Sequence, residues 1–308
     1  MSERVKVDEF LTELLSICHP LEPFNMALLD AHGATLAEDI YAGERLVLKK
    51  DSRIRSTQIG LAASIGLDHL PTRPHPRVVV LSAGPDLVEP GKNLEVGEEY
   101  ETNSWLLTTA VRETGAVAYR VHTIPDDEDA LQAVIEDQLV RADLIIISGE
   151  RHDDSFDLIT RTLSRIGEIK TVDIAIESSG RHNYGVIGPD KTPVVTLPGD
   201  PIAAYISFEL LIRPMIRTML GASTIHRPSV KAKLEKAVKS SGGFRSYVRA
   251  VLSEDGKKVL PLNETGSSAQ DEQAALSDAN SFIAVPEGET EIPAGKDVTV
   301  VVLERRYL

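Results

Sequence analysis

Cysteine is nearly absent from this sequence, and long apolar runs are missing. The one cysteine, Cys18, excludes an internal disulfide and a multi-cysteine metal site, and its apolar neighbours suggest a small buried side chain in a helix. No apolar run approaches the roughly 20 residues of a membrane span, so direct membrane insertion is not expected. A reducing cytoplasm is the expected compartment.

Positive charge is also scarce. Lys and Arg total 33 against 47 Asp and Glu, which makes the formal net charge −14. This balance argues against a nucleic-acid partner and against polybasic attachment to a membrane. What the chain does have is 308 residues that are 42% hydrophobic, enough for two or three domains with buried cores.

The middle of the chain, residues 76–222, alternates apolar runs that are typical of strands with helical patterns. Predicted strands at 78–82 and 143–148 are continuous apolar runs, as in sheets that are buried on both faces. The predicted helices cover 103–113, 126–140, 156–167 and 201–221. This alternation predicts an α/β domain with a doubly wound sheet and helices on both faces.

The two flanking regions follow different patterns. Residues 1–75 form a helical and extended segment, with an amphipathic helix at 7–17 and further predicted helices at 26–36 and 56–65. Residues 223–308 are short strands separated by Gly, Ser and Asn, which predicts a small β-barrel or sandwich.

Three strand–loop junctions of the middle region share a pattern of an apolar run, a glycine and a polar or acidic group. Their glycines are Gly84, Gly149 and Gly199. Carboxyl ends of parallel strands meet at one edge of a sheet, and open α/β sheets bind ligands there. The acids beside the glycines fit either helix caps or a ligand site. The histidines show no zinc-binding spacing, and neither GxSxG nor a Walker A motif occurs, so no metal site is assigned.

Five segments, taken in order, resemble the molybdopterin molybdenumtransferase family, the MoeA and gephyrin E-domain group. They are LEPFNMALLDAHGATLAEDIYA, RVVVLSAGPDLVEPG, YETNSWLLTTAVRETGA, DLIIISGERHDDSFDLI and VVTLPGDPIAA. SYVRAVL and SDANSFIAVPEG also resemble segments of the family's terminal β domain. The resemblance covers nearly the whole chain.

The resemblance implies a three-layer α/β domain of the molybdopterin-binding type, a small C-terminal β-barrel domain and an elongated homodimer. It also implies a reaction, the insertion of molybdate into adenylylated molybdopterin with Mg²⁺ and the release of AMP. Adenylylated molybdopterin and Mg²⁺ are therefore expected ligands if the protein is active, and none is expected otherwise.

Site residues are carried over from the family motifs that they match. The candidates for catalysis are Asp157 and Asp86. The candidates for ligand binding are Ser82, Gly84, Asn103, Ser104, Ser148, Gly149, Arg181, Pro198, Gly199 and Asp200.

Departures from the family pattern fall in the implied ligand cleft. A whole inserted domain is missing near 46–50. In the loop after the 143–148 strand, Glu150 and Asp154 replace glycines, and Ser155 replaces an aspartate. A segment that is basic in the family reads ESSGR at 177–181, and Asp200 replaces an asparagine. Added acids and lost lysines should weaken the binding of an anionic ligand.

Two functions remain open at this point. The favoured hypothesis is a catalytically silent, dimeric binding or scaffold protein with an eroded active site and, by the resemblance to gephyrin, a protein or peptide partner. The alternative is a functional molybdenumtransferase, supported by Asn103, Ser104, Asp157 and the LPG turn at 197–199.

Overall fold

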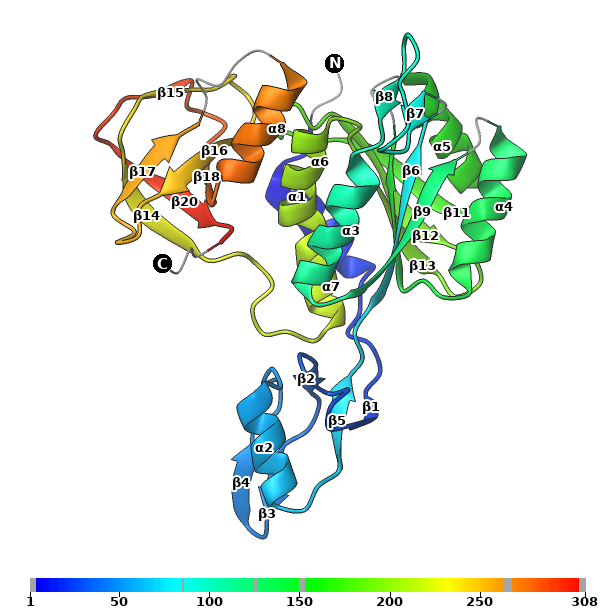
Figure 1. Cartoon of the computed structure of the whole chain (residues 1–308), viewed down its shortest axis with the longest axis vertical. Coiled ribbons are helices and arrows are strands. Elements are labelled where there is room, and N and C mark those ends of the chain that lie inside the picture. Colours follow the sequence, from blue (N-terminus) through cyan, green and yellow to red (C-terminus); the bar gives the residue numbers. More distant parts are fainter. Residues whose placement is uncertain (1–3, 85, 125–126, 150–152, 263–267, 305–308) are drawn as a thin grey trace.

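The protein consists of a central α/β domain with a β-barrel on one side and an N-terminal lobe that projects away from both (Figure 1). The structure is a computed structural model, and it describes residues 4–84, 86–124, 127–149, 153–262 and 268–304. Within these residues, no helix combines the length and the apolar character needed to cross a membrane.

The central sheet has the strand order β11-β12-β13-β10-β6-β9. Its parallel strands are β6 (Arg77–Ala83), β9 (Val117–Ile124), β10 (Leu144–Ser148) and β13 (Thr192–Leu197). Two strands complete one edge with antiparallel pairing, β12 (Arg181–Ile187) and β11 (Gly167–Asp173). The parallel core agrees with the alternation of strand and helix patterns in the sequence.

Helices cover both faces of this sheet, so the three-layer prediction is confirmed. Val78 and Val80 face one apolar core, and Val79 and Leu81 face another. The first core is covered by α1 (Val7–Ser16), α3 (Asn103–Thr114), α6 (Pro201–Ser207) and α7 (Arg213–Met219). The second is covered by α4 (Glu128–Leu139) and α5 (Asp153–Ile166). Burial on both faces explains why these strands are continuous apolar runs.

The predicted helix at 201–221 contains an irregular turn. A π-helical turn, η1 (Phe208–Ile212), separates α6 from α7. Its Glu209 is buried and accepts two hydrogen bonds from Arg227, at 2.7 and 2.8 Å, at the connection to the barrel.

The N-terminal lobe follows α1. It holds a three-stranded sheet, a hairpin and α2 (Ser56–Ser64). The sheet strands are β1 (Phe24–Ala27), β5 (His69–Arg73) and β2 (Thr35–Leu36), and the hairpin strands are β3 (Ile40–Ala42) and β4 (Arg45–Leu48). The lobe has its own small apolar core, which includes Leu36, Ile54 and Leu70.

The predicted helix at 26–36 is wrong. Met26 pairs with Leu70 in antiparallel register, and Thr35 pairs with Arg73. Gly33 between them has a positive φ of 85°, a conformation outside the right-handed helix. The pairing partners lie about 40 residues away in the chain, so non-local strand pairing overrides the local helical pattern.

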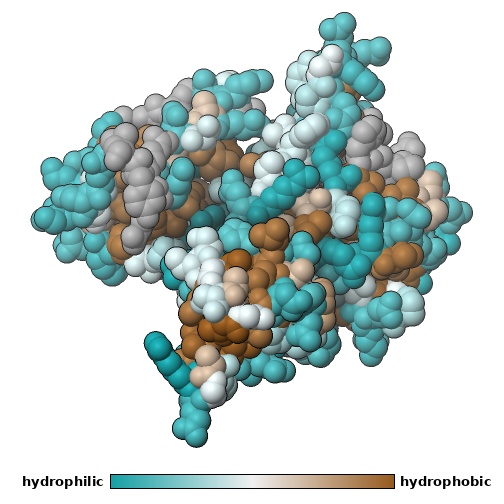
Figure 2. Space-filling model, turned by 60° about the horizontal axis from the view of Figure 1, so that its bottom comes forward, coloured by the Kyte–Doolittle hydropathy of each residue, from teal (hydrophilic) through white to brown (hydrophobic). Residues whose placement is uncertain are grey.

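Large hydrophobic side chains of the lobe are exposed. The most exposed are Phe24, Leu29, Tyr41 and Leu46, with Leu29 85% exposed. Figure 2, in which the lower part of the molecule comes forward, shows hydrophobic surface gathered centrally and surrounded by hydrophilic side chains. Contiguous apolar surface of this kind is typical of an interaction site.

The C-terminal strands close into a barrel in the order β14-β17-β16-β18-β20. They are β14 (Ser229–Leu234), β17 (Lys258–Pro261), β16 (Ser246–Leu252), β18 (Ser281–Val285) and β20 (Asp297–Val302). A short pair, β15 (Val238–Lys239) and β19 (Glu291–Ile292), and α8 (Ala269–Asp278) accompany them. Arg245 of the barrel domain donates two hydrogen bonds of 3.0 Å to Asp8 of α1, which ties the barrel to the α/β domain.

Candidate functional site

The carboxyl ends of β6, β10 and β13 meet at one edge of the sheet. The chain passes from β6 outward to β9 and then back across β6 to β10, so the strand order reverses between β6 and β10. Such a reversal opens a crevice where α/β sheets commonly bind ligands. Ser82 ends β6, Ser148 ends β10, and the turn at Pro198 and Gly199 follows β13.

Asn103, the first residue of α3, joins these strand ends. Its side-chain NH₂ donates to Ser148 Oγ at 2.7 Å and to the carbonyl oxygen of Gly199 at 2.8 Å. Ser148 in turn donates to the carbonyl oxygen of Pro198 at 3.2 Å. Asn103, Ser148, Pro198 and Gly199, all chosen from the sequence, therefore lie together.

A cavity of about 510 Å³ opens over this edge, a size that is typical of small-molecule sites. Its lining includes Ser82, Asp86, Leu87, Leu94, Gly97, Glu98, Glu99, Tyr100, Glu101, Thr102, Asn103, Gly149, Gly199, Pro201, Gln270 and Gln273. Among the described residues, the buried atoms Ser82 Oγ and Asn103 Oδ1 have no hydrogen-bond partner. Unpaired buried polar atoms are unusual in proteins, but both atoms are closed to solvent and so do not themselves form the cavity surface.

A flap (residues 86–100) forms one wall of the cavity. Its short strands β7 (Leu87–Val88) and β8 (Glu99–Tyr100) pair in parallel. The Tyr100 hydroxyl donates to the carbonyl oxygen of Lys92 at 2.9 Å, which holds the flap together internally.

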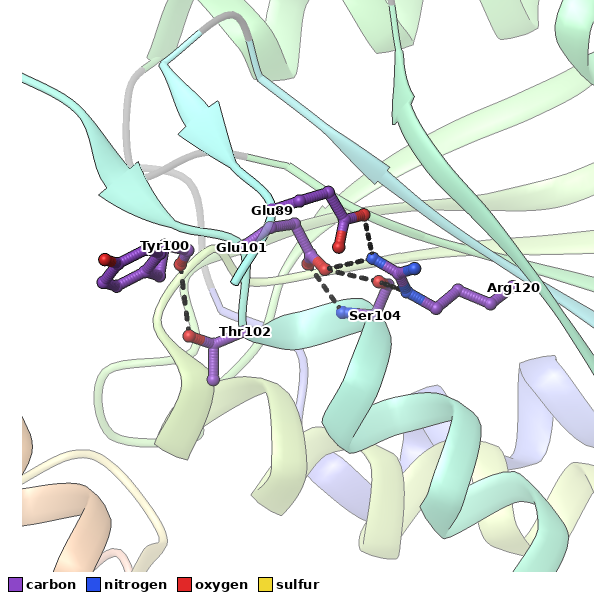
Figure 3. Close-up of polar contacts among 6 residues, drawn as sticks. All are labelled: Glu89, Tyr100, Glu101, Thr102, Ser104 and Arg120. Carbon is purple, nitrogen blue, oxygen red and sulfur yellow. Dashed lines mark hydrogen bonds and ion pairs between the residues drawn. The ribbon is translucent and has the colours of Figure 1, made fainter. Parts of the chain in front are cut away.

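The flap is anchored to the sheet by a buried charge network (Figure 3). Arg120 of β9 pairs with Glu89 of the flap and with Glu101, at 3.3 Å from the latter, and its Nε donates to Ser104 Oγ at 2.6 Å. Glu101 also accepts from the Ser104 backbone N–H at 2.7 Å. The Arg120 guanidinium lies 4.1 Å from the centre of the Trp105 ring.

Arg120 and Glu89 were missed by the sequence analysis. Ser104 was chosen as a ligand residue, but its hydroxyl lies between Glu101 and Arg120 in this network. An arginine in an otherwise alternating strand (117–124) is a weak signal, because a solvated face carries arginine equally well.

Other predicted residues have structural partners. One Asp200 oxygen caps α6 by accepting from the backbone N–H groups of Ile202 and Ala203, both at 3.0 Å. Asp157 and Arg181 are both exposed and form an ion pair of 3.9 Å, with Arg181 stacked on Phe156.

The residues that replace family motifs are only partly described. Glu150 lies outside the described residues, as do Arg151 and His152 and the side chain of Asp154. Glu177, where the resemblance expects a basic segment, accepts from the Ser241 backbone N–H at 3.2 Å and so contacts the barrel domain. Burial raises the pKa of Glu177, but hydrogen bonds from Ser241 and Ser246 outweigh this and lower it overall.

The cavity does not offer a preformed magnesium cage. Among the described residues, no group of three carboxylate, His or Cys side chains converges closely enough to hold an ion. Mg²⁺ is commonly held by carboxylates together with oxygens of a bound ligand.

A second buried polar network lies beside the edge, at the start of β12. His182 Nδ1–H donates to the carbonyl oxygen of Thr196 at 2.8 Å, so Nε2 accepts from the Ser179 hydroxyl at 2.9 Å. Ser179 Oγ accepts in turn from the Ser207 hydroxyl at 2.8 Å. All three side chains are buried, so we assign them a structural role in the fold.

Comparisons with known proteins agree with this architecture. A family model described as a probable molybdopterin binding domain matches residues 79–218, and one described as the MoeA C-terminal region (domain IV) matches residues 231–303. Molybdopterin molybdenumtransferase 2 of Mycobacterium tuberculosis is 34% identical over 269 residues, which are 85% of this chain and 65% of that protein. Molybdopterin molybdenumtransferase of Bacillus subtilis is 26% identical, over 86% of this chain and 61% of that protein. The aligned chain thus spans less than two thirds of these relatives.

A solved structure confirms the likeness in fold. The molybdopterin biosynthesis MoeA protein of Pyrococcus horikoshii superposes with a TM-score of 0.81 at 21% identity, covering 98% of this chain and 99% of that chain.

We predict that Arg120→Met lowers the free energy of unfolding by about 3–5 kcal/mol, because it leaves the fully buried Glu101 carboxylate without its cation. Adding Glu101→Gln should restore a large part of this loss, since the buried charge is then gone as well. Urea denaturation of both variants measures the difference. If Arg120→Met alone lowers the free energy of unfolding by less than about 1 kcal/mol, the charge network does not stabilise the fold in this way.

We also predict a loss of stability on acidification that comes from His182. Burial lowers the pKa of His182 from 6.5 to about 4. Between these values the unfolded chain binds a proton that the folded protein excludes, so stability falls as the pH drops from 6.5 towards 4, by about 3 kcal/mol. Urea titrations across this range should show a flatter pH dependence for His182→Gln. The exposed His19→Gln serves as the control and should keep the wild-type slope.

Proposed function

This chain belongs to the MoeA family of molybdenum cofactor biosynthesis proteins, and we propose that it is a member that acts as a binding or scaffold protein and no longer inserts molybdenum. Adenylylated molybdopterin and molybdate, the reactants that the family resemblance implies, are anions. A working site must therefore offset negative charge at the cavity.

The charge of the cavity lining carries this proposal. Asp86, Glu98 and Glu99 line the cavity, whereas the described residues of the lining include no Lys, Arg or His. Two unit charges about 4 Å apart interact by roughly 4 kcal/mol near a protein surface, so carboxylates at these positions oppose a phosphate or molybdate. The repulsion from these carboxylates acts on the bound anionic reactants and on their transition state alike.

Two arginines of this domain are paired with carboxylates. Arg120 pairs with Glu89 and Glu101 behind the cavity wall, and Arg181 pairs with Asp157. Glu177, in the segment where the resemblance expects basic residues, accepts a hydrogen bond from the barrel domain. The departures from the family pattern thus support the proposal that the fold is kept while its anion-binding groups are lost.

A working molybdenumtransferase is the second candidate. It is favoured by the geometry of Asn103, Ser148 and Gly199, which holds the strand ends together beside the formed cavity. Such a cavity supports ligand binding with or without catalysis.

The release of AMP separates the two candidates. The purified protein, incubated with adenylylated molybdopterin, Mg²⁺ and molybdate, is expected to release no AMP above the protein-free blank. Molybdopterin molybdenumtransferase 2 of Mycobacterium tuberculosis, assayed in parallel, is a suitable positive control because it is 34% identical over most of this chain. AMP release at a rate comparable to that control would overturn the proposal and establish the enzyme.

We further propose that the protein acts as a homodimer that associates through the N-terminal lobe. The support is the exposure of four large hydrophobic side chains, Phe24, Leu29, Tyr41 and Leu46, on a lobe that projects from the rest of the molecule (Figure 1). Burial of apolar area of this kind drives stable association between subunits.

Sedimentation velocity tests the dimer. The wild type should sediment as a dimer, and the combined variant Leu29→Ser, Tyr41→Ser, Leu46→Ser as a monomer, because it removes apolar area from the interface. Val140→Ser is a matched control, since Val140 is 87% exposed but lies in the α/β domain. A monomeric wild type, or a triple variant that stays dimeric, would rule out association through this surface.

A further inference from the structure

We infer that a separate site for a phosphate group lies at the joint between the N-terminal lobe and the α/β domain, where residues 17–23 and 74–76 connect the two. Arg53 and Arg73 of the lobe and Arg217 of α7 form this site. Its ligand is inorganic phosphate or a small phosphate ester. The inference does not rest on the proposed function, because β6 begins near the joint and ends at the cavity (Figure 1).

Two of the arginines lie on one face of the lobe's sheet. Thr35 of β2 pairs with Arg73 on one side and forms an isolated antiparallel bridge with Arg53 on the other. Side chains of directly paired residues in antiparallel strands lie on the same face. Arg53 and Arg73 therefore flank Thr35, which is itself buried.

This face of the lobe meets the C-terminal end of α7. Arg73 packs over Gly221, where an added Cβ would lie only 2.6 Å from Arg73 Nε. Arg73 Nη1 also donates to the carbonyl oxygen of Leu21 at 2.6 Å, and the Leu21 N–H donates to the carbonyl oxygen of Met219 at 2.9 Å. Arg73 is thus held where the lobe contacts α7, whose lower end lies above β2 and β5 in Figure 1.

Arg217, in the last turn of α7, brings a third positive charge to the joint. Burial lowers the pKa of Arg217, and the charge of Arg53 lowers it further. The two guanidinium groups are therefore close enough to repel each other, and among the described residues none of the three arginines forms an ion pair with a carboxylate. An anion between these cations would relieve the repulsion.

The hydrogen bonds that fasten the joint use few of the available donors. A guanidinium group has five N–H donors. Apart from the bond to Leu21, the cluster's side chains make one further bond within the described residues, from Arg217 Nε to the carbonyl oxygen of Thr224 at 3.2 Å. Arg53 is exposed, and its side chain makes neither a hydrogen bond nor an ion pair there. Fastening the joint therefore leaves Arg53 without a role.

Phosphate matches this set of donors. A phosphate monoester carries about 1.5–2 negative charges at neutral pH and several acceptor oxygens, so it can compensate more than one arginine. The planar fork of arginine also fits two phosphate oxygens at once. The formal net charge of the chain is −14, so an anion is attracted only where cations are gathered locally.

A phosphate bound here connects two parts of the protein. Two of its arginines belong to the lobe and the third to α7 of the α/β domain. Binding therefore stabilises one placement of the lobe against the α/β domain, because each guanidinium adds a charge-assisted hydrogen bond across the joint.

Isothermal titration calorimetry of the full chain with inorganic phosphate and with glycerol 2-phosphate, at low salt, tests the inference. At least one probe should bind saturably, and the tighter of the two identifies free phosphate or the ester as the ligand class. Binding should weaken as sodium chloride is added, because salt screens the charges. If neither probe binds saturably up to about 10 mM, the inference is wrong.

Variants locate the site. Arg53→Gln should weaken binding at least about tenfold and leave the melting temperature of the free protein unchanged, because this exposed side chain has no partner among the described residues. Arg217→Gln should weaken binding in the same way. Arg45→Gln is the matched control, since it removes an exposed charge from the β3–β4 hairpin of the same lobe and should keep the wild-type affinity. Equal affinity of Arg53→Gln and Arg45→Gln would overturn the inference.

Hydrogen exchange measured by mass spectrometry tests the link between the two parts. The bound probe should slow amide exchange at residues 32–36 of the lobe and 217–224 after α7, and it should do so in the wild type but not in Arg53→Gln. Strand β18 of the barrel serves as the internal control and should not change. Equal slowing in β18 would mean a general stabilising effect of the salt and would contradict a site at the joint.

Discussion

The amide of Asn103 is the interaction on which the cavity depends. Through two hydrogen bonds it joins the start of α3 to the end of β10 and to the turn after β13, segments that lie 45 and 96 residues away in the chain. Both bonds are made by the NH₂ group, and among the described residues the buried amide oxygen has no hydrogen-bond partner. One side chain thus positions the strand ends beside the cavity.

The acidic residues around this site have separate roles, and the difference matters for function. Asp200 caps a helix, Glu177 contacts the barrel domain, and Glu101 neutralises Arg120. Asp86, Glu98 and Glu99 line the cavity, as Glu101 also does, but Glu101 is paired with Arg120. The proposed loss of anion binding concerns Asp86, Glu98 and Glu99, whereas Asp200 and Glu177 have structural roles.

Family membership and the local chemistry point in compatible directions. The α/β domain and the barrel keep the architecture of MoeA proteins, and the framework of the strand edge is intact. A fold can be kept while its site changes, because packing and catalysis depend on different residues.

The sequence by itself determined the class and order of the main elements. Continuous apolar strands, capped helices and glycine-containing junctions are local signals, and they predicted that Gly84, Gly149 and Gly199 lie at one sheet edge. Asn103 and Ser148 were added by the family resemblance. Tertiary structure decided the rest. The 26–36 segment became strand because its partners lie in β5, and Arg120 acquired its role from Glu89 and Glu101, which no local pattern connects to it. Pairing and burial of charge depend on contacts between distant residues, and those contacts exist only in the folded chain.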